Sequence, residues 1–275
     1  MESPTFVILT VLSIYPFVYT LYYSLTNFYY ISKDGLDFVG LKNYADLVRN
    51  PYFIRAVINT IKFTVACTLL ETVAGVAVAV YVNGLRHFKK TMRTILLLPN
   101  LLPPVTAALI WKIMLSNNYG IINEFLRFMH IPVFNWFFDT RTAMPVIILI
   151  DVWQCMPFVF LLIYASLQTV PQTLYEAAKI DGANKWHEFR YITMPCISGA
   201  VVLCLLLRTI DSFRMFDKIN ILTGGGPANT TATITQFIYT YGIKSLKFGY
   251  GSAGAVVMAA IVLLLSIQYI KKSMK

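Results

Sequence analysis

The segment PQTLYEAAKIDGANKWHEFRYITMP, residues 171–195, lies between two long apolar runs, residues 143–168 and 197–222. It is mostly polar and rich in residues that favour helices. A polar, helix-prone segment between two apolar runs is typical of a loop that leaves a membrane, folds outside it and re-enters. This segment therefore predicts a helical membrane protein with a structured loop on one side.

Local signals divide the loop into two short helices. Thr173 followed by Glu176 predicts a capping box at the start of a helix over 174–180. Gly182 stands just past the end of that helix, where a left-handed residue stops it. A second short helix is expected from Asn184 through 190. Helices of this length are marginal in water, so their apolar side chains need a surface to pack on. That surface is either the rest of the chain or another protein.

The composition of the whole chain agrees with a membrane location. Of its 275 residues, 57% are hydrophobic and only 13% are charged, and the mean hydropathy is +0.63. A soluble domain carries about 25% charged residues, so this chain has roughly half the charge that it would need. The net charge of +10 is interpreted as membrane topology and not as a nucleic-acid partner. We expect one all-α domain that spans a lipid bilayer.

Six segments are apolar enough to cross a bilayer whose core is about 30 Å thick. They are residues 5–28, 57–82, 94–115, 143–168, 197–222 and 248–270. The third contains Pro99, Pro103 and Pro104, so we expect it to be kinked, with neighbouring helices satisfying the freed carbonyls. Charged residues interrupt the second half of the fifth.

The distribution of basic residues predicts the orientation. Six spans place both termini on one side, together with the loops 83–93, 169–196 and 271–275. Those loops hold ten Lys and Arg residues in 44 positions, whereas the opposite loops hold eight in 79. Since Lys and Arg collect on the cytoplasmic side, we expect both termini and the loop 169–196 to be cytoplasmic.

The sequence does not predict an enzyme. His87, His130 and His187 fall in predicted loops, where they cannot activate a membrane-embedded nucleophile. Gly224–Gly226 is followed by Pro227 and not by Lys-Ser or Lys-Thr, so it is not a phosphate-binding loop. The cysteines lie in or beside apolar runs, with no spacing typical of disulfides or metal ligands: they are Cys67, Cys155, Cys196 and Cys204. We therefore expect no metal and no cofactor in this chain.

Two polar helix faces are candidates for a solute pathway, since ionisable residues inside spans are costly. Both show the spacing i, i+3, i+4, i+7, which places four residues on one face. The first face is Asp151, Gln154, Cys155 and Phe158, and the second is Arg208, Asp211, Ser212 and Met215. Either they line a water-filled cavity, or Arg208 and Asp211 neutralise each other while Asp151 and Gln154 tie helices together. Glu71 needs a partner on another helix.

The loop resembles the EAA loop of bacterial ABC-importer permeases, in the form found in the carbohydrate-uptake branch. The residues that carry the resemblance include Glu176, Ala177, Ala178, Asp181 and Gly182, with Pro195 at the end. Other stretches agree in order along the chain: FVGLKNY (38–44), NPYF (50–53), LLPNLLPP (97–104), FDKINILTGGGPANTT (216–231) and FGYGSA (248–253). The chain departs from the family pattern at Met194 and Gly199, neither of which affects the loop helices.

The resemblance implies a fold, a function and a set of partners. The fold is the type I ABC importer permease, and the function is alternating-access uptake of a sugar, an oligosaccharide or a related polar solute across a bacterial inner membrane. The loop helices of that family are coupling helices that dock on a cytoplasmic ATP-binding subunit, here through Glu176 to Gly182. Two such subunits hold the ATP and Mg²⁺, a second permease subunit completes the pathway, and an extracytoplasmic solute-binding protein delivers the solute.

The resemblance also bears on the two polar faces. Aligned without gaps, Gln154, Cys155 and Phe158 fall where maltose-type permeases line their sugar site. The same holds for Asp211, Ser212 and Met215. An ion-gradient-driven secondary transporter is the alternative. Such a transporter could use the same buried charges, but it would not need a docking loop.

Overall fold

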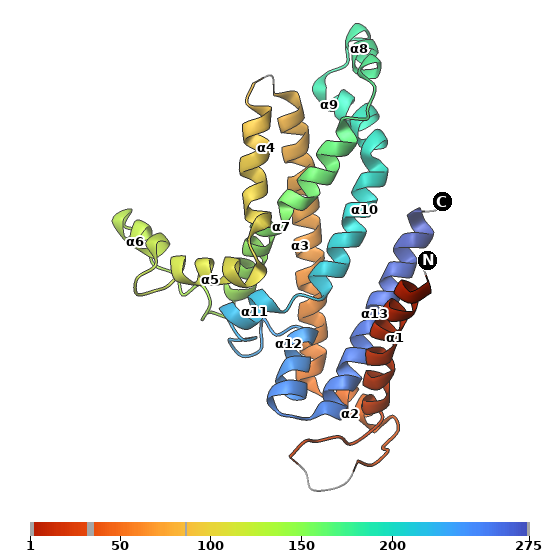
Figure 1. Ribbon diagram of the computed structural model, residues 1–275. Helices are drawn as coiled ribbons and strands as arrows, with labels where there is room; N and C mark the ends of the chain where they lie inside the picture. The colour runs from red at the N-terminus through yellow and green to blue at the C-terminus, as the bar shows by residue number, and fades with distance from the viewer. Residues whose placement is uncertain (1–2, 32–35, 86, 274–275) are drawn as a thin grey trace.

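The computed structural model describes residues 3–31, 36–85 and 87–273, and it is built almost entirely of helices (Figure 1). Within those ranges there is no β-strand, only an isolated bridge between Thr26 and Phe38. The all-α prediction is therefore confirmed. Three cations that enter the loop charge count, Lys33, Arg86 and Lys275, lie outside the described residues.

Among the residues that the structure describes, four helices are long and apolar enough to cross a membrane. They are α3 (Pro51–Gly84), α7 (Ala143–Leu167), a continuous helix over Lys185–Phe213 and α13 (Phe248–Ser273). A fifth span is formed if one bent helix pair is counted as a single crossing. The predicted number of six is thus not confirmed, although α1 (Ser3–Ser24) is a 22-residue helix in the region of the first predicted span.

The third predicted span is broken. Residues 94–115 contain the end of α4 (Lys89–Leu97), a 3-10 turn and α5 (Pro104–Met114), and the two halves meet at 94°. Proline has no N–H to donate and restricts the residue before it, so the run of prolines ends one helix and starts the next. The expected kink is confirmed. One freed carbonyl, that of Leu102, accepts a hydrogen bond from Gln154 Nε2 at 2.7 Å.

The fifth predicted span, 197–222, is also not one helix. The chain leaves α10 (Met194–Phe213) and turns before the short helix α11 (Asp217–Leu222). After α11 come α12 (Ile234–Ile238) and a π-helical turn, Tyr239–Lys244. The charged residues that interrupt the apolar pattern lie around this turn, where the helix cannot continue as an apolar span.

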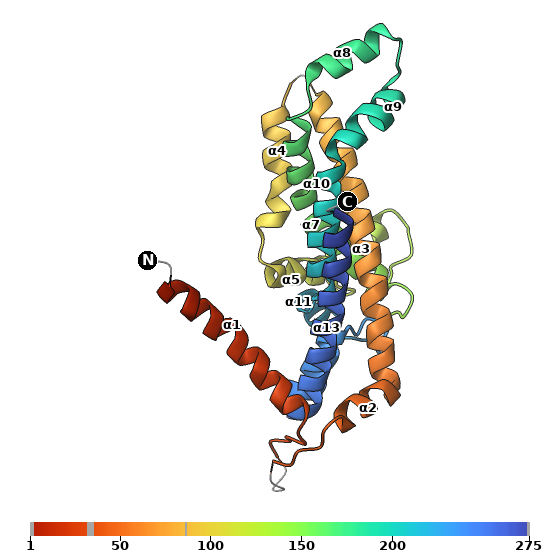
Figure 2. The same cartoon turned by 90° about the vertical axis from the view of Figure 1, so that its right-hand side faces the viewer.

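The centre of the bundle is the close pairing of α3 with α7, against which α10 packs (Figure 1). Gly75 makes the pairing possible, because a Cβ atom at this position would lie 2.6 Å from Cγ1 of Val159. By contrast α1 contacts α13 at one end and diverges from the bundle toward its N-terminus (Figure 2).

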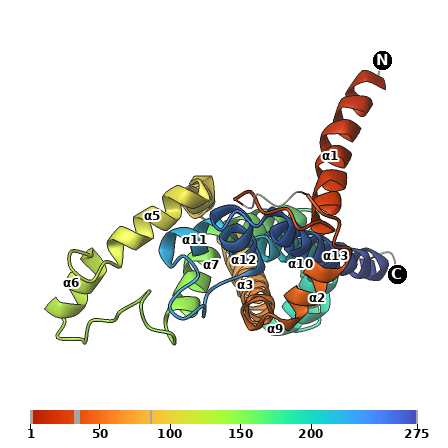
Figure 3. The same ribbon diagram turned by 90° about the horizontal axis from the view of Figure 1, so that it is seen from below.

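The remaining short helices lie away from this centre. Helix α8 (Gln172–Ile180) lies at one extremity of the molecule, which we call the α8 end, and α2 (Lys42–Arg49) lies near the opposite end (Figure 1). Helix α6 (Ile121–Phe128) follows α5 out to one side, as the view along the bundle shows (Figure 3).

Candidate functional site

The loop at the α8 end contains two helices joined by a tight turn (Figure 2). Gly182 has a φ of +74°, as predicted for a left-handed stop. The Ala183 amide donates to the Ala178 carbonyl at 2.9 Å, and the Gly182 amide donates to the Lys179 carbonyl at 3.2 Å. These two bonds form a Schellman motif, which satisfies the last carbonyls of α8 and fixes the direction in which the chain leaves it.

The start of α8 differs from the prediction. The helix begins at Gln172, with Pro171 in the N-cap position and no side-chain capping bond. The capping box of Thr173 and Glu176 does not form, because Thr173 already lies inside the first turn. The ring of Pro171 fixes its φ at −61°, a value compatible with the start of a helix, and this determines where α8 begins.

The second loop helix, α9 (Lys185–Glu188), begins where it was expected. The Asn184 side chain caps it by accepting a hydrogen bond from the His187 amide at 2.9 Å. It does not end at 190, however, since a π-helical turn, Phe189–Thr193, joins it to α10 without a break. The expected separate helix is therefore the first part of a bundle helix.

The loop presents apolar side chains that its own bundle does not cover. Ile180 is 87% exposed and Trp186 is 67% exposed. Of the five predicted docking residues, Ala178 is half-buried, and the other four, Glu176, Ala177, Asp181 and Gly182, are exposed. Tyr175 is the exception that ties α8 down, through a 3.0 Å hydrogen bond between its hydroxyl and that of Thr193. An uncovered apolar surface at a loop tip is typical of a protein interaction site.

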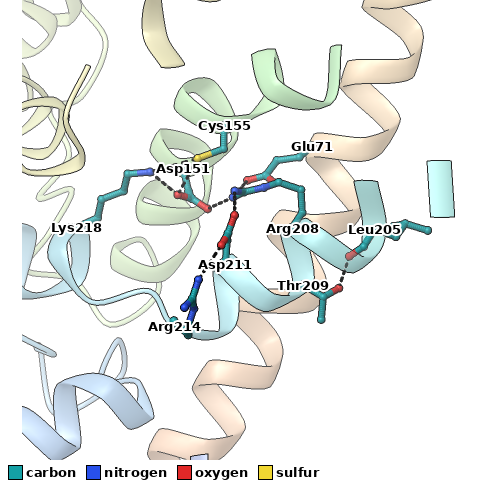
Figure 4. Close-up of polar contacts among 9 residues, drawn as sticks. All are labelled: Glu71, Asp151, Cys155, Leu205, Arg208, Thr209, Asp211, Arg214 and Lys218. Atoms are coloured by element: carbon teal, nitrogen blue, oxygen red, sulfur yellow. Dashed lines mark hydrogen bonds and ion pairs between the residues drawn. The ribbon is translucent and has the colours of Figure 1, made fainter. Parts of the chain in front are cut away.

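The two predicted polar faces meet in a buried cluster of charges (Figure 4). Arg208 on α10 donates to Glu71 on α3 through Nε and Nη2, at 2.5 Å and 3.2 Å. Its Nη2 lies 3.7 Å from Oδ2 of Asp151 on α7. Asp151 in turn accepts from Lys218 on α11. The cluster therefore connects four helices with two acids and two cations, so that its net charge is zero.

Burial makes this neutrality important. Glu71 and Asp151 are fully buried, Lys218 is 1% exposed and Arg208 is 5% exposed. A charge at such a site is tolerated only when it is paired, because the protein interior solvates it poorly. The expectation that Glu71 has a partner on another helix is confirmed. The arrangement also favours a structural role for Asp151 and Arg208 over direct contact with a solute.

The other residues of the two faces have different environments. Asp211 is half exposed and lies at the rim, 3.4 Å from Arg208 and 3.1 Å from Arg214. Phe158 and Met215 are half-buried. Three further residues complete the faces: Gln154 is buried against Leu102, Cys155 is half-buried beside Asp151 and Ser212 is buried. Of these six, Asp211, Met215, Phe158 and Cys155 are accessible.

Lys218 was missed as a site residue by sequence reasoning. It lies near the end of the fifth predicted span, where it was interpreted only as one of the charged residues that interrupt the apolar pattern. A lysine at that depth does require an acid, and Asp151 lacked an assigned partner, so the pairing could have been inferred.

One group of side chains has the composition of a metal site. The Cys67 thiol and the carboxylates of Glu71 and Asp151 lie within 4.8 Å of one another. Both carboxylates are already paired with cations, Arg208 and Lys218. A divalent ion would add positive charge to a neutral buried cluster, so we assign no metal to it.

Known proteins resemble the chain over most of its length. Residues 71–270 match the family described as binding-protein-dependent transport system inner membrane component. The trehalose/maltose transport system permease protein MalF of Thermococcus litoralis is 36% identical, covering 85% of this chain and 79% of the relative. The sulfoquinovosyl glycerol transport system permease protein SmoG of Agrobacterium fabrum is 32% identical, covering 98% and 87%.

A solved structure shows the same fold. A chain of a bacterial alginate ABC transporter, in complex with an alginate pentasaccharide-bound periplasmic protein, superposes with a TM-score of 0.86. The match covers 98% of this chain and 91% of that chain at 22% identity. At this level of identity the similarity concerns the fold alone.

Proposed function

Because this chain belongs to the family of binding-protein-dependent transport system inner membrane components, we propose that it is the permease subunit of an ATP-driven importer for a saccharide. The family consists of transport subunits and not of enzymes. The similarities give no support to the ion-gradient-driven alternative.

The exposed loop at the α8 end carries this proposal. A short helix of nine residues, α8, is held by a Schellman turn and one hydrogen bond, and it presents Ile180 outward, next to the exposed Trp186 of α9. Such a helix needs a partner, because burial of one large apolar side chain contributes about 1.5–3 kcal/mol. The partner we propose is a cytoplasmic ATP-binding subunit, with Glu176 to Gly182 in its groove.

The saccharide class is supported by the relatives. One carries trehalose and maltose by name, and another carries sulfoquinovosyl glycerol. The half-exposed Asp211 and the half-buried Phe158 and Met215 combine an acceptor with soft and aromatic surfaces, which suits a polyhydroxylated solute. We propose these three and Cys155 as pathway residues, with the buried Gln154, Ser212, Asp151 and Arg208 as their support.

The remaining partners and the topology are part of the same proposal. A second permease, two ATP-binding subunits that hold ATP and Mg²⁺, and an extracytoplasmic solute-binding protein complete the importer. In the inner membrane, α1 and the bent pair α4–α5 supply the fifth and sixth crossings. The N-terminal end of α1 and the C-terminal end of α13 point toward the α8 end (Figure 1), which supports cytoplasmic termini.

The docking role is tested in the complex reconstituted with its ATP-binding subunits. Replacement Ile180→Ser should weaken retention of the ATP-binding subunit by about tenfold and reduce uptake in proportion, since the apolar contact is lost. The matched control is Phe128→Ser on α6, which is 81% exposed and lies away from the loop. Equal subunit retention and equal uptake in both variants would refute the docking role.

A further inference from the structure

A cleft of about 650 Å³ lies at the end of the bundle opposite α8. Its walls are the N-terminal part of α3, the segment that precedes α7 and the loop that contains Thr230. The loop is fixed to α3, because Asn59 Nδ2 donates to the carbonyls of Asn229 and Ala232, both at 3.0 Å. Hydrogen bonds within the fold therefore hold this wall of the cleft in place.

The charge that lines the cleft is entirely positive. Arg55, Lys62 and Arg141 line it, and none of the described carboxylates does. Within the part of the chain that the structure describes, none of the three forms an ion pair. Arg55 donates to the Ala228 carbonyl at 3.2 Å. The Asp139 carboxylate accepts from the Arg141 backbone amide and is not part of the lining. Three uncompensated cations facing one space attract an anion.

The surface next to these cations is apolar. Ile58 lies on the face of α3 that carries Arg55 and Lys62, and it is 46% exposed. The same face continues along α3 through Val65, Leu69 and Val73, which are 52%, 54% and 68% exposed. Val65 and Leu69 also line an apolar groove of about 370 Å³ between α3, α10 and α13. The cationic cleft thus lies at one end of an exposed apolar stripe on α3, formed by Ile58, Val65, Leu69 and Val73.

The depth of the cations fits a bilayer surface. About 20 residues separate Lys62 from Val82, which corresponds to a rise of about 30 Å, the thickness of the hydrocarbon core. Counted from Val82, where the predicted span 57–82 ends, this rise reaches Lys62, and long basic side chains near such a boundary extend to the headgroups.

We propose that this cleft binds the phosphate headgroup of an anionic phospholipid, with an acyl chain along the stripe of Ile58, Val65 and Leu69. The cations complement the phosphate and the stripe complements the chain. A soluble anionic saccharide would match the cations but not the apolar stripe. This site goes beyond the proposed function, and it does not depend on the solute that is carried.

The experiment uses the permease purified with its partner subunits from vesicles of equal phosphatidylglycerol and phosphatidylcholine, with retained lipids counted by mass spectrometry. One basic residue near anionic lipid contributes roughly a fivefold preference, so three contribute about 100-fold. The variant Arg55→Gln/Lys62→Gln/Arg141→Gln should lose the enrichment of phosphatidylglycerol, and Lys62→Gln alone should lower it about fivefold.

The matched control is Lys42→Gln/Arg49→Gln/Lys247→Gln, which removes three cations that line a separate cleft containing Asp46. It should retain the enrichment. Equal enrichment in the two triple variants would overturn the proposal. Two other results would also overturn it, both with the lipid retained by the cleft variant. Loss of the partner permease would show that the cleft is a protein interface, and loss of binding of added galacturonate would show that it is a solute site.

Discussion

Lys218 on α11 and Asp151 on α7 form a buried ion pair across 67 residues of the chain. In space, the pair is one end of a row of side chains with alternating charge, which continues through Arg208 to Glu71 on α3 (Figure 4). Each of the four groups needs its neighbours, because the surrounding helices exclude water. Removing one charge and removing a complete pair should therefore have very different effects.

Replacement Lys218→Met should destabilise the protein by about 3–5 kcal/mol, because it leaves two buried acids facing one arginine. The double variant Lys218→Met/Asp151→Asn should recover most of that loss, since Arg208 and Glu71 remain paired. Thermal unfolding in detergent micelles measures both. If the double variant is no more stable than the single one, the four groups do not act as a neutral unit.

Gln154 and Asp211 lie on the two predicted pathway faces, but the structure gives them different roles. Gln154→Leu removes the hydrogen bond to the broken third span, so it should lower stability by roughly 1–3 kcal/mol. Asp211→Leu lies at the half-exposed rim and should change the KM for uptake with less effect on stability. Parallel unfolding and uptake measurements distinguish the two. A stable Gln154→Leu protein would exclude its supporting role.

Gly182→Val should separate ATP hydrolysis from uptake in the reconstituted importer. A β-branched residue at φ +74° costs about 1–2 kcal/mol, which is enough to redirect the chain between α8 and α9. Gly182→Asn is the matched control, because asparagine tolerates the left-handed region. Uptake per ATP hydrolysed should fall in the valine variant and be retained in the asparagine variant. Identical ratios would show that the turn does not set coupling.

Gly75→Ala should destabilise the α3–α7 pairing by about 1–3 kcal/mol, because the added methyl overlaps Val159 and approaches the Phe160 backbone. Gly199→Ala makes the same chemical change in α10, where a Cβ would meet nothing within 4 Å. It should be neutral or stabilising, since alanine is the better helix former. The difference between their unfolding temperatures checks the prediction. No difference would mean that the helices can separate without cost.

Much of the fold could be predicted because apolar length and proline positions are local properties of the sequence. They place α7 and α13 well, and they predict that Pro99 to Pro104 interrupt a span. The 94° angle depends instead on contacts between distant segments, such as Gln154 with Leu102 and Lys112 with Ile221. The helix start at Pro171 shows the reverse case, in which one local signal overrides another, the Thr173 cap.

Only part of the candidate site could be predicted from the sequence. Helical spacing places Asp151 and Gln154 on one face, and it places Arg208 and Asp211 on another, but it does not say which helices meet. Arg208 pairs mainly with Glu71, 137 residues away, and less closely with Asp211, its neighbour on the same helix. The loop turn at Gly182, by contrast, depends only on adjacent residues and was predicted correctly.

The continuous helix Lys185–Phe213 has a mechanical consequence. Trp186, near its exposed end, and Arg208, among the buried charges, lie on this one helix, about 33 Å apart along its length. No loop separates the two residues, only the π-helical turn Phe189–Thr193, so a displacement of the loop tip is transmitted along one helix to the ion pairs. Moving the loop tip would therefore strain the ion pairs that Arg208 forms with Glu71 and Asp151.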